Sequence, residues 1–132
     1  MHRNKYGRQY YALVGGGVDE GETPEQALHR ELQEEVSMTI ANPRLVIIED
    51  AGEYFGTQYI YLCEYIGGEP KLAADSEEAA AHALGQNLYD PMWLPLKDLP
   101  NVEFLPPELR DVILKGLENG FPDTPIELKI PA

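Results

Sequence analysis

Three glutamates in one short stretch of the sequence could hold a divalent metal ion. Glu34 and Glu35 follow Glu31 by three and four positions. Residues at these spacings are neighbours on the surface of a helix. Together they would span an arc of about 100° around the helix axis. Because carboxylates this close repel one another, a hard cation that prefers oxygen ligands, Mg²⁺ or Mn²⁺, would relieve the repulsion.

The residues before the three glutamates predict a helix that begins after a glycine-rich loop. Thr23 is a good N-cap, Pro24 suits the first helical position, and Gln26 completes a capping box. We therefore expect a helix over positions 24–36. Its buried face is predicted from three residues that recur every fourth position: Leu28, Leu32 and Val36. The glycines at positions 15–17 would let the backbone approach a phosphate closely.

A group of acidic residues on a helix is by itself most often a solvated face. The surrounding pattern changes this interpretation, because positions 16–38 resemble the Nudix box. That box reads Gly, five residues, Glu, seven residues, then Arg-Glu-U-x-Glu-Glu-x-Gly-U, where U is a bulky aliphatic residue. The matching positions are Gly16, Glu22, Arg30, Glu31, Leu32, Glu34, Glu35 and Met38. Ser37 departs from the box, which has its second glycine there, and we expect activity to survive this change.

The resemblance implies an α/β (α+β) fold, the Nudix α/β/α sandwich with a mixed sheet. It also implies hydrolysis of a nucleoside diphosphate linked to another moiety, with Mg²⁺ or Mn²⁺ as cofactor. The small-molecule substrate would then be a nucleoside triphosphate, a nucleotide sugar or an ADP-ribose-like compound. Carried over to this chain, Glu31, Glu34 and Glu35 are the catalytic metal ligands, and the backbone carbonyl of Gly16 is a further ligand.

Other charged residues have separate expected roles. Glu22 and Arg30 resemble the structural members of the box, an ion pair that ties the loop to the helix. Arginine suits this role because its planar fork can hold a carboxylate through two hydrogen bonds. In some Nudix enzymes a glutamate outside the box is the general base, and Glu77 or Glu78 would be its position here. The alternative for both is an exposed acidic residue at the start of a helix.

Hydrophobic runs and turn residues predict the remaining elements. Strands are expected over positions 9–14, 44–48, 57–66, 92–96 and 126–130, and a second helix over positions 107–118. Positions 53–56 would form a hairpin loop, and positions 75–84 a loop or a short helix. Core positions are expected at Trp93 and on one face of the second helix, at Leu109, Val112, Ile113 and Leu117. These elements would place two helices around a mainly antiparallel or mixed sheet.

Composition narrows the class of protein and its partners. The formal net charge of −13 repels the backbone of nucleic acid, so no nucleic acid partner is expected. The alternative is that the acidity serves only solubility. No apolar run is long enough to cross a membrane. A length of 132 residues favours a single domain over positions 1–132. Cys63 has no second cysteine to pair with, which favours the reducing cytoplasm.

The N-terminal region departs from the Nudix pattern. Nudix domains usually have one or two full strands before the glycine-rich loop, whereas about fourteen residues precede Gly15 here. The fold is therefore expected to lack part of the N-terminal strand region. An open sheet edge would favour a homodimer or a strand swapped between neighbours.

Two functions from different classes are compatible with the sequence. The first is a Nudix pyrophosphohydrolase. The second is a nucleotide-binding or regulatory module that has lost turnover. Retention of Glu31, Glu34 and Glu35 favours the enzyme, because these are the residues that a degenerate module loses first.

Overall fold

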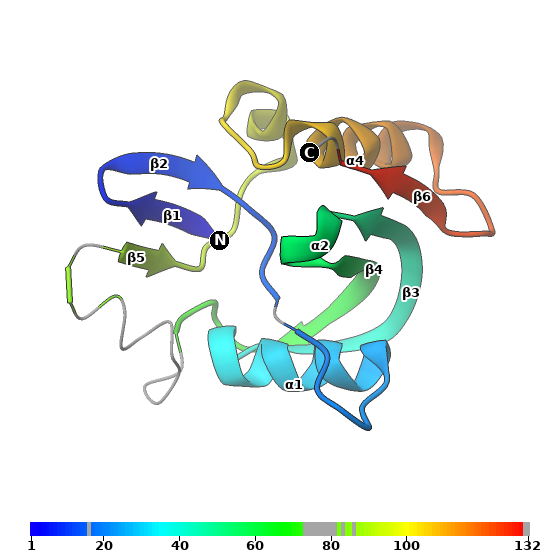
Figure 1. Cartoon of the computed structure of the whole chain (residues 1–132), viewed down its shortest axis with the longest axis horizontal. Coiled ribbons are helices and arrows are strands. Elements are labelled where there is room, and N and C mark those ends of the chain that lie inside the picture. The colour runs from blue at the N-terminus through cyan, green and yellow to red at the C-terminus, as the bar shows by residue number, and fades with distance from the viewer. Residues whose placement is uncertain (16, 73–81, 83, 86, 131–132) are drawn as a thin grey trace.

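Figure 1 shows the computed structural model, which describes residues 1–15, 17–72, 82, 84–85 and 87–130. Its described strands form two three-stranded sheets. The first has the order β2-β1-β5 and is antiparallel throughout; its strands are β1 (His2–Lys5), β2 (Arg8–Tyr11) and β5 (Asn87–Asp90). The second has the order β4-β3-β6, and its strands are β3 (Thr39–Asp50), β4 (Thr57–Gly67) and β6 (Ile126–Lys129). In this sheet β3 pairs antiparallel with β4 and parallel with β6, so the predicted mixed α and β class is confirmed.

Helix α1 (Pro24–Val36) has the bounds that its capping residues predict. The Thr23 hydroxyl accepts a hydrogen bond from the Gln26 amide at 3.1 Å, and the Gln26 side chain accepts one from the Thr23 amide at 2.9 Å. This reciprocal pair satisfies two amides that a helix N-terminus would otherwise leave without partners. The start of α1 is therefore fixed by hydrogen bonds between residues close in sequence.

The connection between β3 and β4 differs from the predicted hairpin loop. It contains a one-turn helix, α2 (Gly52–Phe55), in which the amide of Gly56 donates to the carbonyl of Gly52 at 2.7 Å. Strand β3 also extends beyond the predicted positions 44–48 at both ends. Its longer pairing with β4 contains register shifts. These shifts interrupt the alternation of inward and outward side chains from which strands are predicted.

The strand predicted at positions 92–96 is wrong. Those residues have no strand structure, and the strand of this region is β5, which pairs with β1. Pro91 and Pro95 bracket the segment, and a proline has no amide hydrogen to donate to a neighbouring strand. Trp93 is also not a core residue: it is 55% exposed and packs edge-on against Tyr65, with ring centroids 5.2 Å apart.

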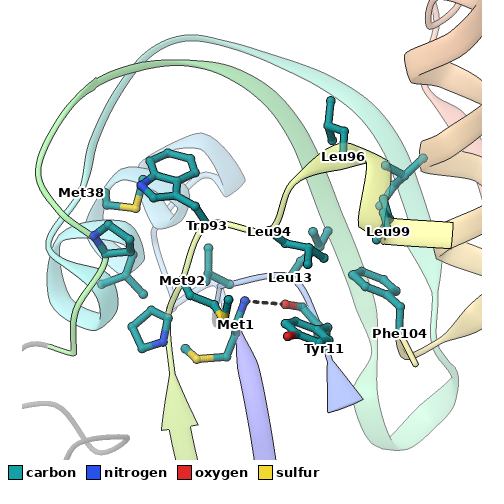
Figure 2. Close-up of a pocket in the computed structure, with 16 residues that line it drawn as sticks. Met1, Tyr11, Leu13, Met38, Met92, Trp93, Leu94, Leu96, Leu99 and Phe104 are labelled. Carbon is teal, nitrogen blue, oxygen red and sulfur yellow. Dashed lines mark hydrogen bonds between the residues drawn. The ribbon is translucent and has the colours of Figure 1, made fainter. Parts of the chain in front are cut away.

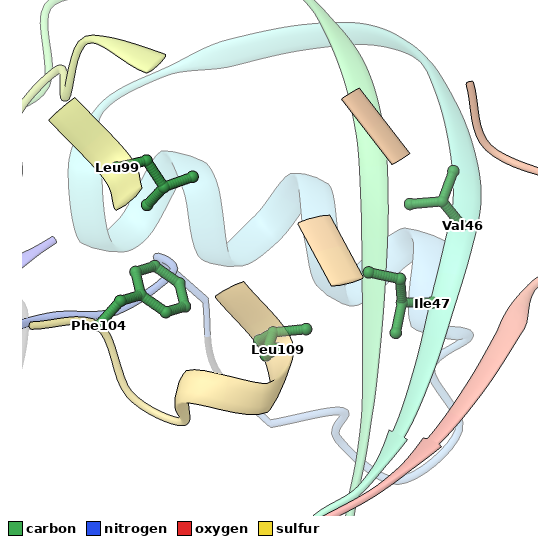
Figure 3. Close-up of a cluster of buried hydrophobic side chains, with 5 residues drawn as sticks. All are labelled: Val46, Ile47, Leu99, Phe104 and Leu109. Carbon is green, nitrogen blue, oxygen red and sulfur yellow. The ribbon is translucent and has the colours of Figure 1, made fainter. Parts of the chain in front are cut away.

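The hydrophobic core joins β3 to the C-terminal helix. It consists of Val46 and Ile47 of β3 with Leu99, Phe104 and Leu109 (Figure 3). Leu99 belongs to the 3₁₀ helix η1 (Leu96–Asn101), and Leu109 belongs to α4 (Pro107–Asn119). The view in Figure 1 places α1 and α4 on opposite sides of the β3–β4 pair. The core thus fixes β3, against which α1 packs from its other side.

Three further expectations have outcomes in the fold. The predicted second helix agrees with α4, but Leu117 is 41% exposed and does not face inward; the buried position next to it is Gly116, which lies against the ring of Phe121. Most of positions 75–84 lies outside the described residues. Within the described part of the chain, no helix is long and apolar enough to span a bilayer.

Candidate active site

Arg30, on the second turn of α1, binds Glu22 in the preceding loop through both prongs of its guanidinium. Its Nε donates to one carboxylate oxygen of Glu22 at 2.8 Å, and its Nη2 donates to the other at 2.9 Å. The amide of Asp19 donates to the same carboxylate at 3.0 Å. These bonds, led by those from Arg30, lower the pKa of Glu22 from its ordinary 4.5 to about 2. The structure therefore contains the ion pair that the sequence predicts between the loop and the helix.

The same guanidinium contacts more of the loop and helix than the sequence predicts. Its Nη1 donates to Glu31 at 2.7 Å and to Glu34 at 3.1 Å. Its Nη2 also donates to the carbonyl of Gly17 at 3.0 Å and lies 3.4 Å from the carboxylate of Asp19. These partners raise the pKa of Arg30 further above its usual range, with Glu22 the largest contributor and Glu31 the next. The guanidinium of Arg30 therefore joins the loop before α1 to the acidic residues of the helix.

The three glutamates of the helix differ in exposure. Glu35 is buried, at 7% exposed, on the side of α1 that also buries Leu32 and Val36. The side chain of Glu31 is 13% exposed and that of Glu34 is 59% exposed. The cluster thus runs from the packed face of α1 to its solvent face. The buried Glu35 and the exposed Glu34 differ in their access to water, so the two carboxylates can have different chemical roles.

The arrangement can be tested for its fit to a divalent cation. Among the described residues, no group of three or more histidines, cysteines or acidic residues is arranged to hold a metal ion. However, oxygens of Glu31 and Glu34 already converge on one positively charged group, Nη1 of Arg30. Both oxygens belong to carboxylates on adjacent turns of α1, and carboxylates are the ligands that Mg²⁺ and Mn²⁺ prefer. The donor chemistry therefore fits such a cation.

Three expected site residues, Gly16, Glu77 and Glu78, lie outside the described residues, so the expected carbonyl ligand and the expected general base stay predictions. Ser37, which replaces the glycine of the box, adopts the left-handed conformation with φ 60° and ψ 35° at the end of α1. The helix therefore ends as the box requires, with serine in a conformation that glycine adopts at lower cost.

An apolar cavity of about 270 Å³ lies beside the end of α1 (Figure 2). Val36 and Met38 line it from that end, and Leu13 and Trp93 line it from the segments that follow β2 and β5. The α-amino group of Met1 donates to the carbonyl of Ala12 at 2.9 Å, the dashed line in Figure 2, and burial lowers its pKa. The cavity is therefore an apolar space beside the C-terminal end of α1, the helix that carries the three glutamates.

The chain is similar to known proteins in sequence and in fold. The model of a family described as NUDIX domain matches residues 1–115, which include the loop and α1. RNA pyrophosphohydrolases of Vibrio atlanticus and Photobacterium profundum are each 50% identical over 42 residues, 32% of this chain and 24% of theirs. The matched segment thus spans about a quarter of the length of these relatives. A solved structure from work on MutT of Aliivibrio salmonicida and Vibrio cholerae is 26% identical, covers 79% of this chain and 74% of its own, and has a TM-score of 0.54.

Proposed function

The chain belongs to the NUDIX domain family, and on that premise we propose that it is a pyrophosphohydrolase that cleaves a nucleoside diphosphate linked to another moiety. The observation that carries this proposal is the pair of carboxylates, Glu31 and Glu34, gathered on one face of α1 beside the buried Glu35. The relatives named RNA pyrophosphohydrolase support the reaction type.

We propose that Glu31, Glu34 and Glu35 hold Mg²⁺ or Mn²⁺, with the carbonyl of Gly16 as a further ligand. When bound, the cation would supply positive charge to the pyrophosphate oxygens and would lower the pKa of a coordinated water. Arg30 donates to Glu31 and Glu34 from one nitrogen, so it holds these two side chains close together before a cation arrives. Metal binding would then compete with one nitrogen of Arg30, while the two bonds to Glu22 keep the guanidinium in place.

The reaction needs a base as well as charge neutralisation. The oxygen of a water molecule forms a bond to phosphorus, the bridging P–O bond breaks, and the proton of the water passes to a carboxylate. Glu34 is the most exposed of the three glutamates, so it is the member of the cluster with the best access to that water. Glu78 is the proposed alternative base outside the box.

The apolar cavity beside α1 is the proposed place for an apolar part of the substrate, such as a nucleobase. Its volume of about 270 Å³ is slightly below the range of about 300–1,000 Å³ that is typical of ligand pockets. Candidate substrates are nucleoside triphosphates, nucleotide sugars and ADP-ribose-like compounds. The names of the relatives add RNA to this group.

Strand β4 supports the proposal that the protein forms a homodimer. Among the described strands it lies at the edge of its sheet, and it exposes Leu62, Tyr65 and Ile66. An exposed edge with apolar side chains is a surface on which a second strand can pair. Light scattering tests this directly, and a strictly monomeric species would overturn it.

The decisive experiment compares the wild-type protein with Glu35→Gln in the presence of Mn²⁺ and a panel of the four substrate classes. We expect release of phosphate, pyrophosphate or nucleoside monophosphate from at least one substrate, and a loss of about a hundredfold or more in the variant. Glu25→Gln is the matched control, because Glu25 lies on the same helix, is exposed and stands outside the cluster. Equal background release by wild type and Glu35→Gln would favour the nucleotide-binding module instead.

A further inference from the structure

The charge of this protein is distributed unevenly along the chain. No acidic residue precedes Asp19, whereas Arg3, Lys5 and Arg8 all lie before it. All 23 acidic residues and seven of the ten lysines and arginines lie in the remainder. The net charge of −13 therefore conceals a short basic region, and a conclusion about partners drawn from net charge alone does not apply to it.

The register of the first sheet gathers this basic region on one face. Arg3 stands opposite Tyr10 on β2 and opposite Tyr89 on β5. Lys5 stands opposite Arg8 on β2 and opposite Asn87 on β5. Directly paired residues project from the same face of a sheet, and side chains two apart along a strand share that face. We call this surface the basic face, formed by Arg3, Lys5, Arg8, Tyr10, Asn87 and Tyr89.

Interactions on the basic face join the cations to the aromatic rings. The guanidinium carbon of Arg3 lies 3.7 Å from the ring centre of Tyr89 and 5.8 Å from that of Tyr10. The guanidinium carbon of Arg8 lies 5.7 Å from the ring centre of Tyr10. Arg3 also donates to the side-chain oxygen of Asn87 and to the backbone carbonyl of Leu88. Arg3 is therefore held over the ring of Tyr89 by neutral partners, which leave its positive charge uncompensated.

Among the described residues, one carboxylate, that of Glu103, forms an ion pair on the basic face. Arg8 pairs with Glu103 at 2.8 Å, but both side chains are more than half exposed, so the pair is weak. Within the part of the chain that the structure describes, neither Arg3 nor Lys5 forms an ion pair. Asp90 stands opposite His2 and therefore belongs to the other face of the sheet, with Tyr11.

We propose that the basic face binds a short stretch of single-stranded nucleic acid. Lysine and arginine would contact its phosphates, and the planes of the Arg3 guanidinium and the tyrosine rings would stack with its bases. Paired bases cannot stack on such a surface, and the acidic remainder of the chain would repel a long duplex. This inference rests on the proposed function in one respect: the bound strand would be the moiety attached to the pyrophosphate that is cleaved.

The glycine-rich loop connects the basic face to α1. Strand β2 ends at Tyr11, and the chain then passes through Gly15 and Gly17 to α1, as Figure 1 shows. The carbonyl of Gly17 in turn accepts a hydrogen bond from Arg30. Strand β2 of the basic face is therefore joined to α1 by the loop that Arg30 binds.

The direct test measures binding without catalysis. The probe is a fluorescent single-stranded RNA of about ten nucleotides with a 5′-hydroxyl, titrated in EDTA and followed by anisotropy. Removing both exposed cations in Lys5→Ala/Arg8→Ala should weaken binding by about tenfold and reduce the salt slope by about 1.4, that is, about 0.7 for each phosphate that is no longer neutralised. The matched control is Lys97→Ala/Lys129→Ala, which removes the same charge from exposed positions outside the face and should leave binding unchanged.

Two further arms identify the ligand. Tyr89→Ala should also weaken binding by about tenfold if bases stack on the face, with circular dichroism as the check on folding. A single-stranded DNA of the same sequence distinguishes recognition of the 2′-hydroxyl from recognition of phosphates and bases alone. Equal loss of binding in both double variants, or equal affinity for duplex and single strand, would overturn the proposal.

Hydrolysis separates this inference from the proposed function. With a 5′-triphosphorylated oligonucleotide, Lys5→Ala/Arg8→Ala should raise KM by about tenfold and leave kcat unchanged, while both constants for a mononucleotide stay as in wild type. If the protein hydrolyses mononucleotides but does not bind the 5′-hydroxyl probe, the proposal for the basic face is wrong and the proposed function stands. A protein that binds the probe but hydrolyses nothing would support the face and overturn the proposed function alone.

Discussion

Gly68 holds the end of α1 against the end of β4, and its replacement by alanine tests how tightly. Its backbone has φ +94°, in the region that favours glycine. A Cβ atom at this position would stand 2.2 Å from the carbonyl oxygen of Ser37 and 3.1 Å from the Cα of Met38. Both are backbone atoms at the end of α1, so no side-chain rotation can relieve the overlap.

Two costs add up for Gly68→Ala. The positive φ costs a residue with a Cβ about 1–2 kcal/mol, and displacing packed backbone costs about 2 kcal/mol more. The total of about 3–4 kcal/mol is a large share of the 5–15 kcal/mol that typically stabilises a domain of this kind. For a chain of 132 residues it corresponds to a fall in Tm of about 10–15 °C.

Thermal unfolding followed by circular dichroism measures the effect, and Gly7→Ala is the matched control. Gly7 has a similar φ of +91°, but nothing lies within 4 Å of the added Cβ. Its substitution should cost only the conformational part, about 1–2 kcal/mol, or about 4–7 °C in Tm. If both variants lowered Tm equally, the close approach of Gly68 to Ser37 would not exist and the reasoning would be refuted.

Three more predictions concern single residues. Ser37→Gly should raise stability by about 0.5–1 kcal/mol in denaturant unfolding, because glycine adopts the left-handed conformation at lower cost, whereas Ser37→Ala should give no gain. Because the pKa of Glu22 is lowered to about 2 in the folded state, its stabilising effect is full above about pH 4.5 and is lost as pH falls toward 2. Glu22→Gln should therefore lower Tm most near neutral pH and progressively less in acid, unlike the exposed neighbour Glu20→Gln. The pKa of Glu49 is raised, first by burial and then by the charge of Glu108, so this carboxyl destabilises the fold once pH exceeds its folded pKa. Glu49→Gln should raise Tm by a few degrees at pH 8, with the advantage shrinking toward pH 4.5; no advantage at pH 8 would contradict the burial of Glu49.

The parts of the fold that local chemistry determines were predictable from the sequence. The bounds of α1 follow from the capping box of Thr23 and Gln26, which acts within four residues. The position of β4 follows from a long aromatic run between turn residues. The division into two sheets was not predictable, because pairing partners such as β1 and β5 lie more than 80 residues apart. The absence of a strand at positions 92–96 has a local cause: neither Pro91 nor Pro95 has an amide hydrogen to donate to a neighbouring strand.

The candidate site was also only partly predictable. The motif indicated a pairing of Glu22 with Arg30, and the structure contains it. The bonds from Arg30 to Gly17 and Asp19 depend on how the loop folds back, which no spacing in the sequence reveals. The bond from Arg30 to Glu34 could have been found, because residues four apart on a helix are neighbours. The charge of the N-terminal hairpin was visible as well, but the net charge of the whole chain obscured it.

The central claim is that the glutamates of α1 bind a divalent cation. Manganese titration followed by electron paramagnetic resonance tests it without any substrate. The account predicts saturable Mn²⁺ binding by the wild-type protein, unchanged binding by Glu25→Gln, and binding weakened by about tenfold or more in Glu35→Gln. Identical Mn²⁺ affinity in all three proteins would contradict the claim.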